Sequence, residues 1–153
     1  QQYAMFEEKH QNIELIGETC WLQGDVFAIE TLLVNLLANA SKYTPDYGQI
    51  RVGVQPLEKE VELCVEDSGP GIPEDQRQRV FDRFYRLRGD QHDSNVSGCG
   101  LGLSIVQHII QLHHAAIEMK VSKFETGLAV VVGFPVNHTE VKEVKEVKEV
   151  KEV

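Results

Sequence analysis

Asn35-Leu36-Leu37-Ala38-Asn39-Ala40-Ser41-Lys42-Tyr43 closes a segment, residues 25–43, in which apolar side chains recur every three and four positions. This spacing predicts one buried face of an α-helix. An aspartate stands before its first turn, and a proline follows soon after its last, as expected at helix ends. On such a helix Asn35, Asn39 and Lys42 fall within about 60° of one another, away from the apolar face. The helix therefore presents two amides and an ammonium together.

That polar stripe suits a phosphate ligand with a divalent cation. Amide oxygens are hard ligands of the kind that Mg²⁺ accepts, and Mg²⁺ commonly bridges phosphates. The ammonium of Lys42 can reach a phosphate as a point charge. Taken alone, the stripe is equally well explained as the solvent face of an ordinary amphipathic helix.

Two glycine-bearing stretches accompany this helix. Asp67-Ser68-Gly69-Pro70-Gly71 follows an apolar strand, and Gly98-Cys99-Gly100-Leu101-Gly102 leads into a second helix. Glycines let a ligand approach the backbone, and the N–H groups at a helix N-terminus favour phosphate. The Asp67 carboxylate can accept a hydrogen bond from an exocyclic amine such as that of adenine. Each stretch alone is a weak signal, since an Asx turn or a glycine loop is common.

A polar segment, residues 87–97, separates the two stretches and predicts a loop that folds over a ligand as a lid. Arg86 at its root is a candidate for contact with a terminal phosphate. Elsewhere the patterns predict helices over 25–43, 73–84 and 101–113, and strands over 13–16, 20–22, 50–54, 61–65, 117–121 and 128–134. Strands and helices do not alternate strictly. We therefore expect the α+β class, as a two-layer α/β sandwich with helices covering one face of a mixed sheet.

The length of 153 residues predicts one domain, which we place at residues 12–137. Residues 1–11 are expected to be the end of an upstream linker or helix. Residues 138–153 contain a Lys-Glu-Val repeat whose period of three fits neither a helix stripe nor a strand face. We expect this segment to be a solvated, low-complexity tail that is disordered outside the fold.

Composition excludes several classes of protein. A net charge of -9 argues against a nucleic-acid partner, which requires a basic face. No apolar run approaches the roughly 20 residues of a membrane span, and the first residues lack the apolar core of a signal peptide. The three cysteines have no metal-ligand spacing and are odd in number, which favours a reduced, cytoplasmic setting.

Four segments, residues 35–44, 67–73, 81–86 and 98–106, together resemble the N, G1, F and G2 boxes of sensor histidine kinases. These kinases share an ATPase superfamily with gyrase B, Hsp90 and MutL. The order and spacing match over roughly residues 10–135, and four boxes in register are specific where each alone is weak. The resemblance implies a Bergerat-type sandwich that holds ATP beneath a lid.

The resemblance also implies roles for individual residues. Asn39 would hold Mg²⁺ with help from Asn35, and Lys42 would contact phosphate, which makes Asn39 and Lys42 the expected catalytic residues. Tyr43 would line the nucleotide pocket, and Asp67 would read the adenine amine. The other candidate nucleotide-binding residues are Gly69, Gly71, Ile72, Arg86, Gly98, Gly100, Leu101, Gly102 and Leu103.

Two departures from the family pattern refine this expectation. Ala38 stands where the family often has an acidic residue. No histidine of this sequence has the acidic, Leu-Arg-Thr-Pro-like context of a phosphoacceptor. We therefore expect the ATP-binding half of a kinase that phosphorylates a histidine on a separate dimerisation and phosphoacceptor domain. It would serve a response regulator indirectly, be monomeric as this chain, and belong to a parent anchored in the inner membrane.

Two alternatives come from other classes. A non-catalytic nucleotide-binding or anti-sigma-type interaction module would have the same fold. An ATPase of the gyrase or Hsp90 type would need a glutamate general base on the first helix. Glu30 is the nearest candidate, but it lies about 140° around the helix from Asn35, on the wrong face.

Overall fold

The structure is a computed structural model that describes residues 9–77 and 102–136. In chain order its elements are β1 (Asn12–Gly17), α2 (Val26–Tyr43), β2 (Gln49–Pro56), β3 (Glu60–Asp67), the short 3-10 helix η1 (Glu74–Gln76), α3 (Gly102–Leu112), β4 (Ala116–Val121) and β5 (Leu128–Pro135). The strands form one sheet in the order β1-β2-β3-β5-β4. β1 pairs with β2 in parallel, and the other three pairs are antiparallel.

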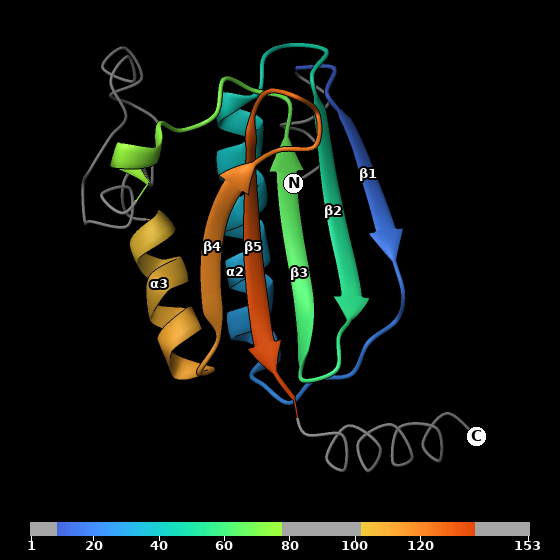
Figure 1. Ribbon diagram of the computed structural model, residues 1–153, viewed down its shortest axis with the longest axis vertical. Coiled ribbons are helices and arrows are strands. Elements are labelled where there is room, and N and C mark those ends of the chain that lie inside the picture. Colours follow the sequence, from blue (N-terminus) through green and yellow to red (C-terminus); the bar gives the residue numbers. More distant parts are fainter. Residues whose placement is uncertain (1–8, 78–101, 137–153) are drawn as a thin grey trace.

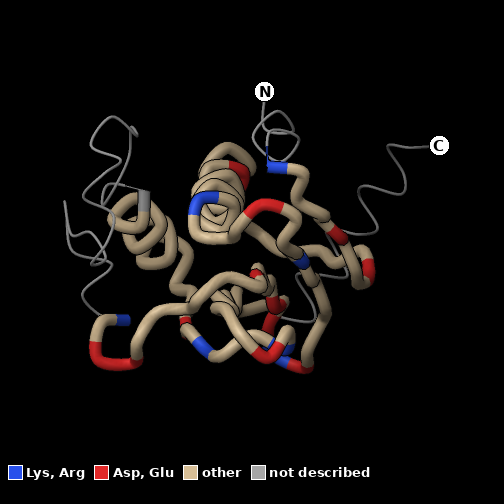
Figure 2. Tube along the Cα trace, turned by 90° about the horizontal axis from the view of Figure 1, so that it is seen from above, with Lys and Arg blue, Asp and Glu red and all other residues tan. Residues whose placement is uncertain are grey.

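α2 and α3 pack side by side on one face of the sheet, and no described element covers the other face (Figure 1). Figure 2 shows the same two layers from above, with both helices on one side of the strands. This arrangement confirms the predicted two-layer sandwich with a mixed sheet. The uncovered side is called the open face below.

The core lies between the helices and the sheet because the strands alternate. In β3 the side chains of Val61, Leu63 and Val65 are buried under the helices, whereas those of Glu62 and Cys64 are only partly buried on the open face. α2 and α3 contribute fully buried side chains to the same core, and each buried aliphatic side chain of this size stabilises the fold by about 1.5 to 3 kcal/mol. The largest fully buried apolar side chains are Leu32, Ile50, Val106 and Val132.

α2 begins and ends close to the predicted positions. The Asp25 carboxylate accepts a hydrogen bond from the backbone N–H of Ala28 at 2.9 Å, the geometry of an N-cap. At the other end Thr44 adopts an extended conformation (φ -91°, ψ 130°), and its N–H still donates to the carbonyl of Ala40 at 3.0 Å. Pro45 then favours that extended conformation in the residue before it.

One predicted strand is wrong. Residues 20–22 form no strand, although Trp21 has high strand propensity. This segment lies between β1 and α2 as an irregular connection, and Leu22 packs against the core from there. A strand needs a neighbour to bond with, and β1 already occupies the edge of the sheet beside β2.

The helix predicted over 73–84 is described only at its start, where η1 is a single 3-10 turn. The remainder lies outside the described residues, as do the predicted lid at 87–97 and the tail at 138–153.

Candidate nucleotide-binding site

The two asparagines of α2 lie one turn apart and bond to the helix itself. Asn35 donates its side-chain amide N–H to the carbonyl of Thr31 at 2.7 Å, and Asn39 donates to the carbonyl of Asn35 at 3.0 Å. Both bonds use Nδ2, so neither of them engages the amide oxygens Oδ1. Acceptor oxygens in a partly buried row are the donor set that Mg²⁺ requires, and the side chains therefore fit the metal implied by the sequence.

Lys42 and Tyr43 form the last residues of α2. The Lys42 ammonium lies 5.2 Å from the centroid of the Tyr43 ring, within range of a cation–π contact. The ring lines a cavity between α2 and the sheet. A positive charge is thereby held at the end of α2 that borders the cavity.

Asp67 is buried at the end of β3, with only 6% of its surface exposed. Its Oδ1 accepts hydrogen bonds from the N–H groups of Gly69 at 2.9 Å and Leu128 at 3.4 Å. Burial raises the pKa of the carboxyl above its usual range, and the nearby charge of Glu66 adds to this, while the two N–H groups oppose it. Because both bonds use Oδ1, the second oxygen is left to accept a donor from a ligand.

The cavity has a volume of about 30 Å³ and joins α2, the sheet and the start of α3. Six predicted site residues line it together with six that the sequence analysis did not assign. The predicted ones are Asn39, Tyr43, Asp67, Gly71, Ile72 and Leu103, and the additional ones are Leu36, Ala40, Val65, Met119, Leu128 and Val130.

The side chains that line this cavity are apolar apart from the Asp67 carboxylate, the Asn39 amide and the Tyr43 phenol. A volume of 30 Å³ holds a water molecule or two, whereas bound ligands of drug size occupy about 300 to 1,000 Å³. A flat base therefore enters only if wall side chains move apart. Met119 can do so most readily, since its unbranched side chain has three rotatable bonds.

Two glycines bring the loops of the site together. A Cβ at Gly69 would lie 2.5 Å from the carbonyl oxygen of Tyr43, so a glycine is what lets the loop after β3 approach the end of α2. Gly127 has a φ of +103°, and a Cβ there would overlap the carbonyl of Asp67. The hairpin between β4 and β5 thus packs directly beneath Asp67.

Glu66 holds that hairpin in place, and sequence reasoning did not single it out. Its Oε2 accepts hydrogen bonds from the N–H of Lys123 at 3.0 Å and the hydroxyl of Ser122 at 3.3 Å. Its Oε1 lies 3.5 Å from the guanidinium of Arg51. Only 5% of Glu66 is exposed. The sequence offered no signal for this burial, because a glutamate is ordinarily exposed unless it is paired and its partners come from other segments.

The cavity residues contributed by the sheet depend on strand register. Val65 lies opposite Val130, and Val130 lies opposite Met119, so the three side chains form one row across β3, β5 and β4. Alternation in the sequence places each of them on an inner face. It does not say which residues of separate strands become neighbours.

The structure describes only part of the predicted site. Arg86, Gly98, Gly100 and Leu101 lie outside the described residues, and Gly102 opens α3. The described part therefore includes Asn35, Asn39, Lys42 and Asp67, the residues predicted to serve the metal, the phosphate and the base.

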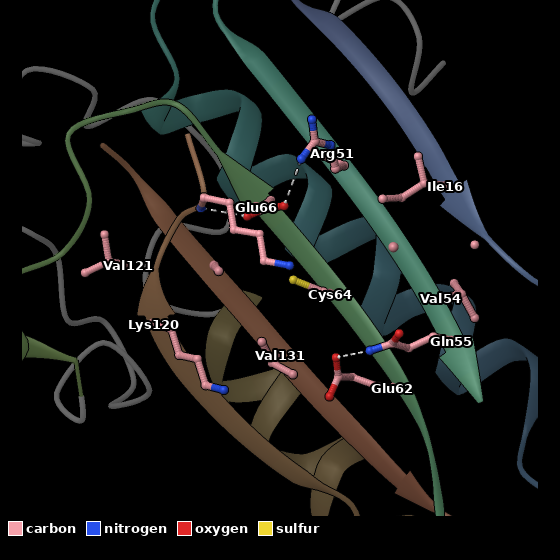
Figure 3. Close-up of a pocket in the computed structure, with 14 residues that line it drawn as sticks. Ile16, Arg51, Val54, Gln55, Glu62, Cys64, Glu66, Lys120, Val121 and Val131 are labelled. Atoms are coloured by element: carbon pink, nitrogen blue, oxygen red, sulfur yellow. Dashed lines mark hydrogen bonds and ion pairs between the residues drawn. The ribbon is translucent and has the colours of Figure 1, made fainter. Parts of the chain in front are cut away.

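A second and larger hollow, of about 300 Å³, lies on the open face (Figure 3). Small residues from three neighbouring strands line the hollow and leave space above the sheet: Gly53, Cys64 and Ala129. Burial, with help from Glu66 and Glu62, raises the pKa of the Cys64 thiol to about 11. The rim mixes both signs of charge, and none of the predicted site residues lines the hollow.

The described segments contain no cluster of three or more His, Cys, Asp or Glu side chains that could hold a metal. No helix in residues 9–77 or 102–136 combines the length and apolar character that a membrane crossing requires.

Comparison with known proteins agrees with this geometry. The family model described as "Histidine kinase-, DNA gyrase B-, and HSP90-like ATPase" matches residues 24–138. The sensor protein kinase PmrB of Pseudomonas aeruginosa is 34% identical over 128 residues, which are 84% of this chain and 26% of PmrB. The signal transduction histidine-protein kinase BaeS of Escherichia coli is 35% identical over 120 residues, 78% of this chain and 25% of BaeS. The chain thus spans about a quarter of these relatives.

Solved structures show the same architecture. The mycobacterial sensor histidine kinase MprB matches with a TM-score of 0.74 and 27% identity, covering 87% of this chain and 89% of that one. The catalytic domain of the histidine kinase ThkA matches with a TM-score of 0.71 and 26% identity, covering 88% of each chain. Nothing in these matches favours the non-catalytic alternative.

Proposed function

Because this chain belongs to the family of histidine kinase-, DNA gyrase B- and HSP90-like ATPases, as a catalytic ATP-binding domain of the sensor histidine kinase type, we propose that it transfers the γ-phosphoryl group of ATP to a histidine on a separate helical domain of its parent protein. The observation that carries this proposal is the apolar cavity at which Asp67 and Asn39 meet. One residue suits the base of the nucleotide and the other suits its metal.

Asp67 is the residue that would select adenine. Its Oδ1 is engaged by two backbone N–H groups, and the exocyclic amine of adenine would donate to the remaining oxygen. Leu36, Val65 and Met119 would enclose the faces of the ring in the apolar cavity. A buried acceptor discriminates strongly, because a base that lacks the amine leaves it unpaired.

The phosphate end would lie along the polar stripe of α2. Asn39 Oδ1, with Asn35 Oδ1 in support, would hold Mg²⁺, and the Lys42 ammonium would contact a phosphate oxygen. When bound, Mg²⁺ supplies neutralisation of the phosphate charge. Further nucleotide contacts are proposed for Tyr43, Gly69, Gly71, Ile72, Arg86, Gly98, Gly100, Leu101, Gly102 and Leu103.

The chemical step is an in-line displacement at the γ-phosphorus. A nitrogen of the acceptor imidazole forms the new N–P bond as the bond to the β,γ-bridging oxygen breaks, ADP leaves, and the imidazole loses its proton. This chain contributes positioning and charge stabilisation, which carry most of the catalysis in phosphoryl transfer. Lys42 stabilises negative charge on the transferring group, and Asp67 fixes the nucleotide at its other end.

The acceptor histidine and any proton acceptor would come from the helical domain of the parent. A response regulator would receive the phosphoryl group from that histidine and so be an indirect partner. We place the domain in the cytoplasm, as a monomer when separated from its parent, which we expect to be anchored in the inner membrane.

Calorimetric titration with ATP and Mg²⁺ tests the nucleotide-binding part of this proposal. We expect the chain to bind ATP and not to bind inorganic triphosphate, which lacks the adenosine. Labelled ATP tests the phosphoryl-transfer part. The chain alone should stay unlabelled, and addition of the parent's helical domain should yield an acid-labile phosphohistidine on that domain. ATP binding without transfer to the helical domain would favour a non-catalytic module instead.

A further inference from the structure

The C-terminal end of α2 is capped by residues that precede β1 in the sequence. The Lys9 ammonium donates to the backbone carbonyls of Ser41 at 2.9 Å, Lys42 at 3.2 Å and Thr44 at 3.3 Å. The side-chain amide of Gln11 donates to the carbonyls of Ser41 at 2.9 Å and Thr44 at 2.8 Å. Five hydrogen bonds thus join the entering chain to the last turn of α2. We call this set the Lys9–Gln11 clamp.

The clamp meets a specific need of this helix. The last carbonyls of any helix lack partners inside it and carry partial negative charge. Many helices satisfy them with a glycine in a left-handed conformation just beyond the end. Here Thr44 is extended and Pro45 follows, so that local solution is absent. An ammonium and an amide from a distant part of the sequence take its place.

The Gln11 side chain is fixed from both ends. Its Oε1 accepts a hydrogen bond from the hydroxyl of Ser41 at 2.7 Å while its amide nitrogen donates to the helix carbonyls. Gln11, Ser41 and Thr44 are 8%, 2% and 1% exposed. The Gln11 amide and the Ser41 hydroxyl are both paired in this buried network, whereas the Thr44 hydroxyl is buried without a hydrogen-bond partner among the described residues. A displacement of Gln11 would therefore leave further buried groups unpaired.

The same segment is also attached to the turn that follows α2. The N–H of Tyr47 donates to the carbonyl of Lys9 at 2.9 Å, and the N–H of Asn12 donates to the carbonyl of Gly48 at 3.0 Å. Residues 9–12 therefore cannot shift without either moving the end of α2 or breaking these bonds.

We propose that Lys9 and Gln11 are positioning residues for the nucleotide site, which they serve by fixing the turn of α2 that carries Lys42. This inference rests on the proposed function, since it assumes that Lys42 contacts a phosphate. Lys9 reaches the backbone of Lys42, while the Lys42 side chain extends over Tyr43 at the cavity. Small displacements of a phosphate-binding group weaken binding steeply. Nucleotide affinity thereby depends on how the chain enters the domain.

A double-mutant cycle between Lys9 and Lys42 tests this positioning role. The dissociation constant of ATP with Mg²⁺ is measured by calorimetry for the wild-type chain, Lys9→Met, Lys42→Ala and the double variant. We expect Lys9→Met to weaken binding by about five- to tenfold in the wild-type background. In the Lys42→Ala background, where no ammonium remains to be positioned, we expect less than about a twofold effect.

Matched controls separate positioning from general stability. Lys9→Arg keeps a cation over the same carbonyls and should retain affinity within about threefold of the wild type. Asp25→Ala removes the cap at the opposite end of α2 and should lower the melting temperature without changing the dissociation constant.

If Lys9→Met does not fold, Lys9→Gln takes its place in the cycle, since it keeps a hydrogen-bond donor without the charge. Equal weakening in both backgrounds, or no weakening in either, would overturn the inference while leaving the proposed function intact. A wild-type chain that binds no nucleotide would instead overturn the proposed function, and this inference with it.

Discussion

The side-chain amide nitrogen of Asn39 lies 3.0 Å from the carbonyl oxygen of Asn35, one turn earlier on the same helix. This bond engages the nitrogen of the Asn39 amide and not its oxygen, and Asn39 lines the cavity. The amide oxygen is the atom that would serve as a ligand of Mg²⁺.

Asn39→Ala should weaken ATP binding by tenfold or more in the presence of Mg²⁺, which corresponds to about 1.4 kcal/mol. The loss of a metal ligand is the expected cause, so titrations in EDTA should show little difference between variant and wild type. Asn35→Ala serves as the matched comparison and should have the smaller effect. Equal weakening with and without Mg²⁺ would contradict a metal-binding role for Asn39.

Asp67→Asn should abolish selectivity for adenine, because the variant offers an N–H₂ group where the ligand amine needs an acceptor. We expect ATP affinity to fall by at least about 30-fold, measured by competition with a fluorescent nucleotide. Asp75→Asn removes one negative charge from an exposed position of η1 and should leave affinity unchanged. If both variants bind ATP as the wild type does, Asp67 is not the adenine reader.

Asp67→Asn should increase the stability of the nucleotide-free protein, although it weakens the binding of ATP. Since the folded state raises the Asp67 pKa, it holds that proton more tightly than the unfolded chain does, and ionisation of Asp67 costs stability. Stability should therefore fall as pH rises from the usual aspartate pKa, about 3.9, through the raised value. Asp67→Asn removes this contribution and should raise the melting temperature near pH 7 by about 2 to 5 °C. A lower melting temperature, or an unchanged pH profile below neutrality, would show that burial does not dominate.

Glu66→Ala should destabilise the domain by about 2 to 3 kcal/mol, measured by urea unfolding. The substitution frees the hairpin at residues 122–124 from its carboxylate and leaves Arg51 without its buried partner. Glu62→Ala is the control, because the only partner of the Glu62 carboxylate among the described residues is the exposed Gln55 side chain; it should cost less than about 0.5 kcal/mol. Similar losses in both variants would mean that Glu66 contributes no more than a surface charge.

Sequence periodicity was sufficient for α2, α3 and most strands. The leucines of α2 and the alternation in β3 are local patterns, and a capping aspartate with a following proline defined the ends of α2. The side-by-side arrangement of Asn35, Asn39 and Lys42 also followed from helix geometry alone. A strand that ends in an aspartate and glycines predicts the tight turn after β3, whereas a ligand-binding role for Asp67 was expected from the family resemblance.

The remaining features depend on contacts between distant segments. The pattern over residues 20–22 predicted a strand, but β1 occupies the edge position beside β2. The order of strands in the sheet cannot be read from a local pattern. The row formed by Val65, Val130 and Met119 depends on register. Lys9 carries no local signal at all, since a lysine before a strand is ordinarily a solvated side chain.

β1 lies at the edge of the sheet, and within residues 9–77 and 102–136 it pairs with β2 alone. An edge strand can separate from its sheet by local unfolding, which costs less free energy than unfolding of the whole domain. Residues 9–11 continue directly into β1, so an opening that separates β1 from β2 also withdraws Lys9 and Gln11 from α2. This edge strand and the end of the helix that bears Lys42 should therefore open together, and amide exchange in β1 should report on both.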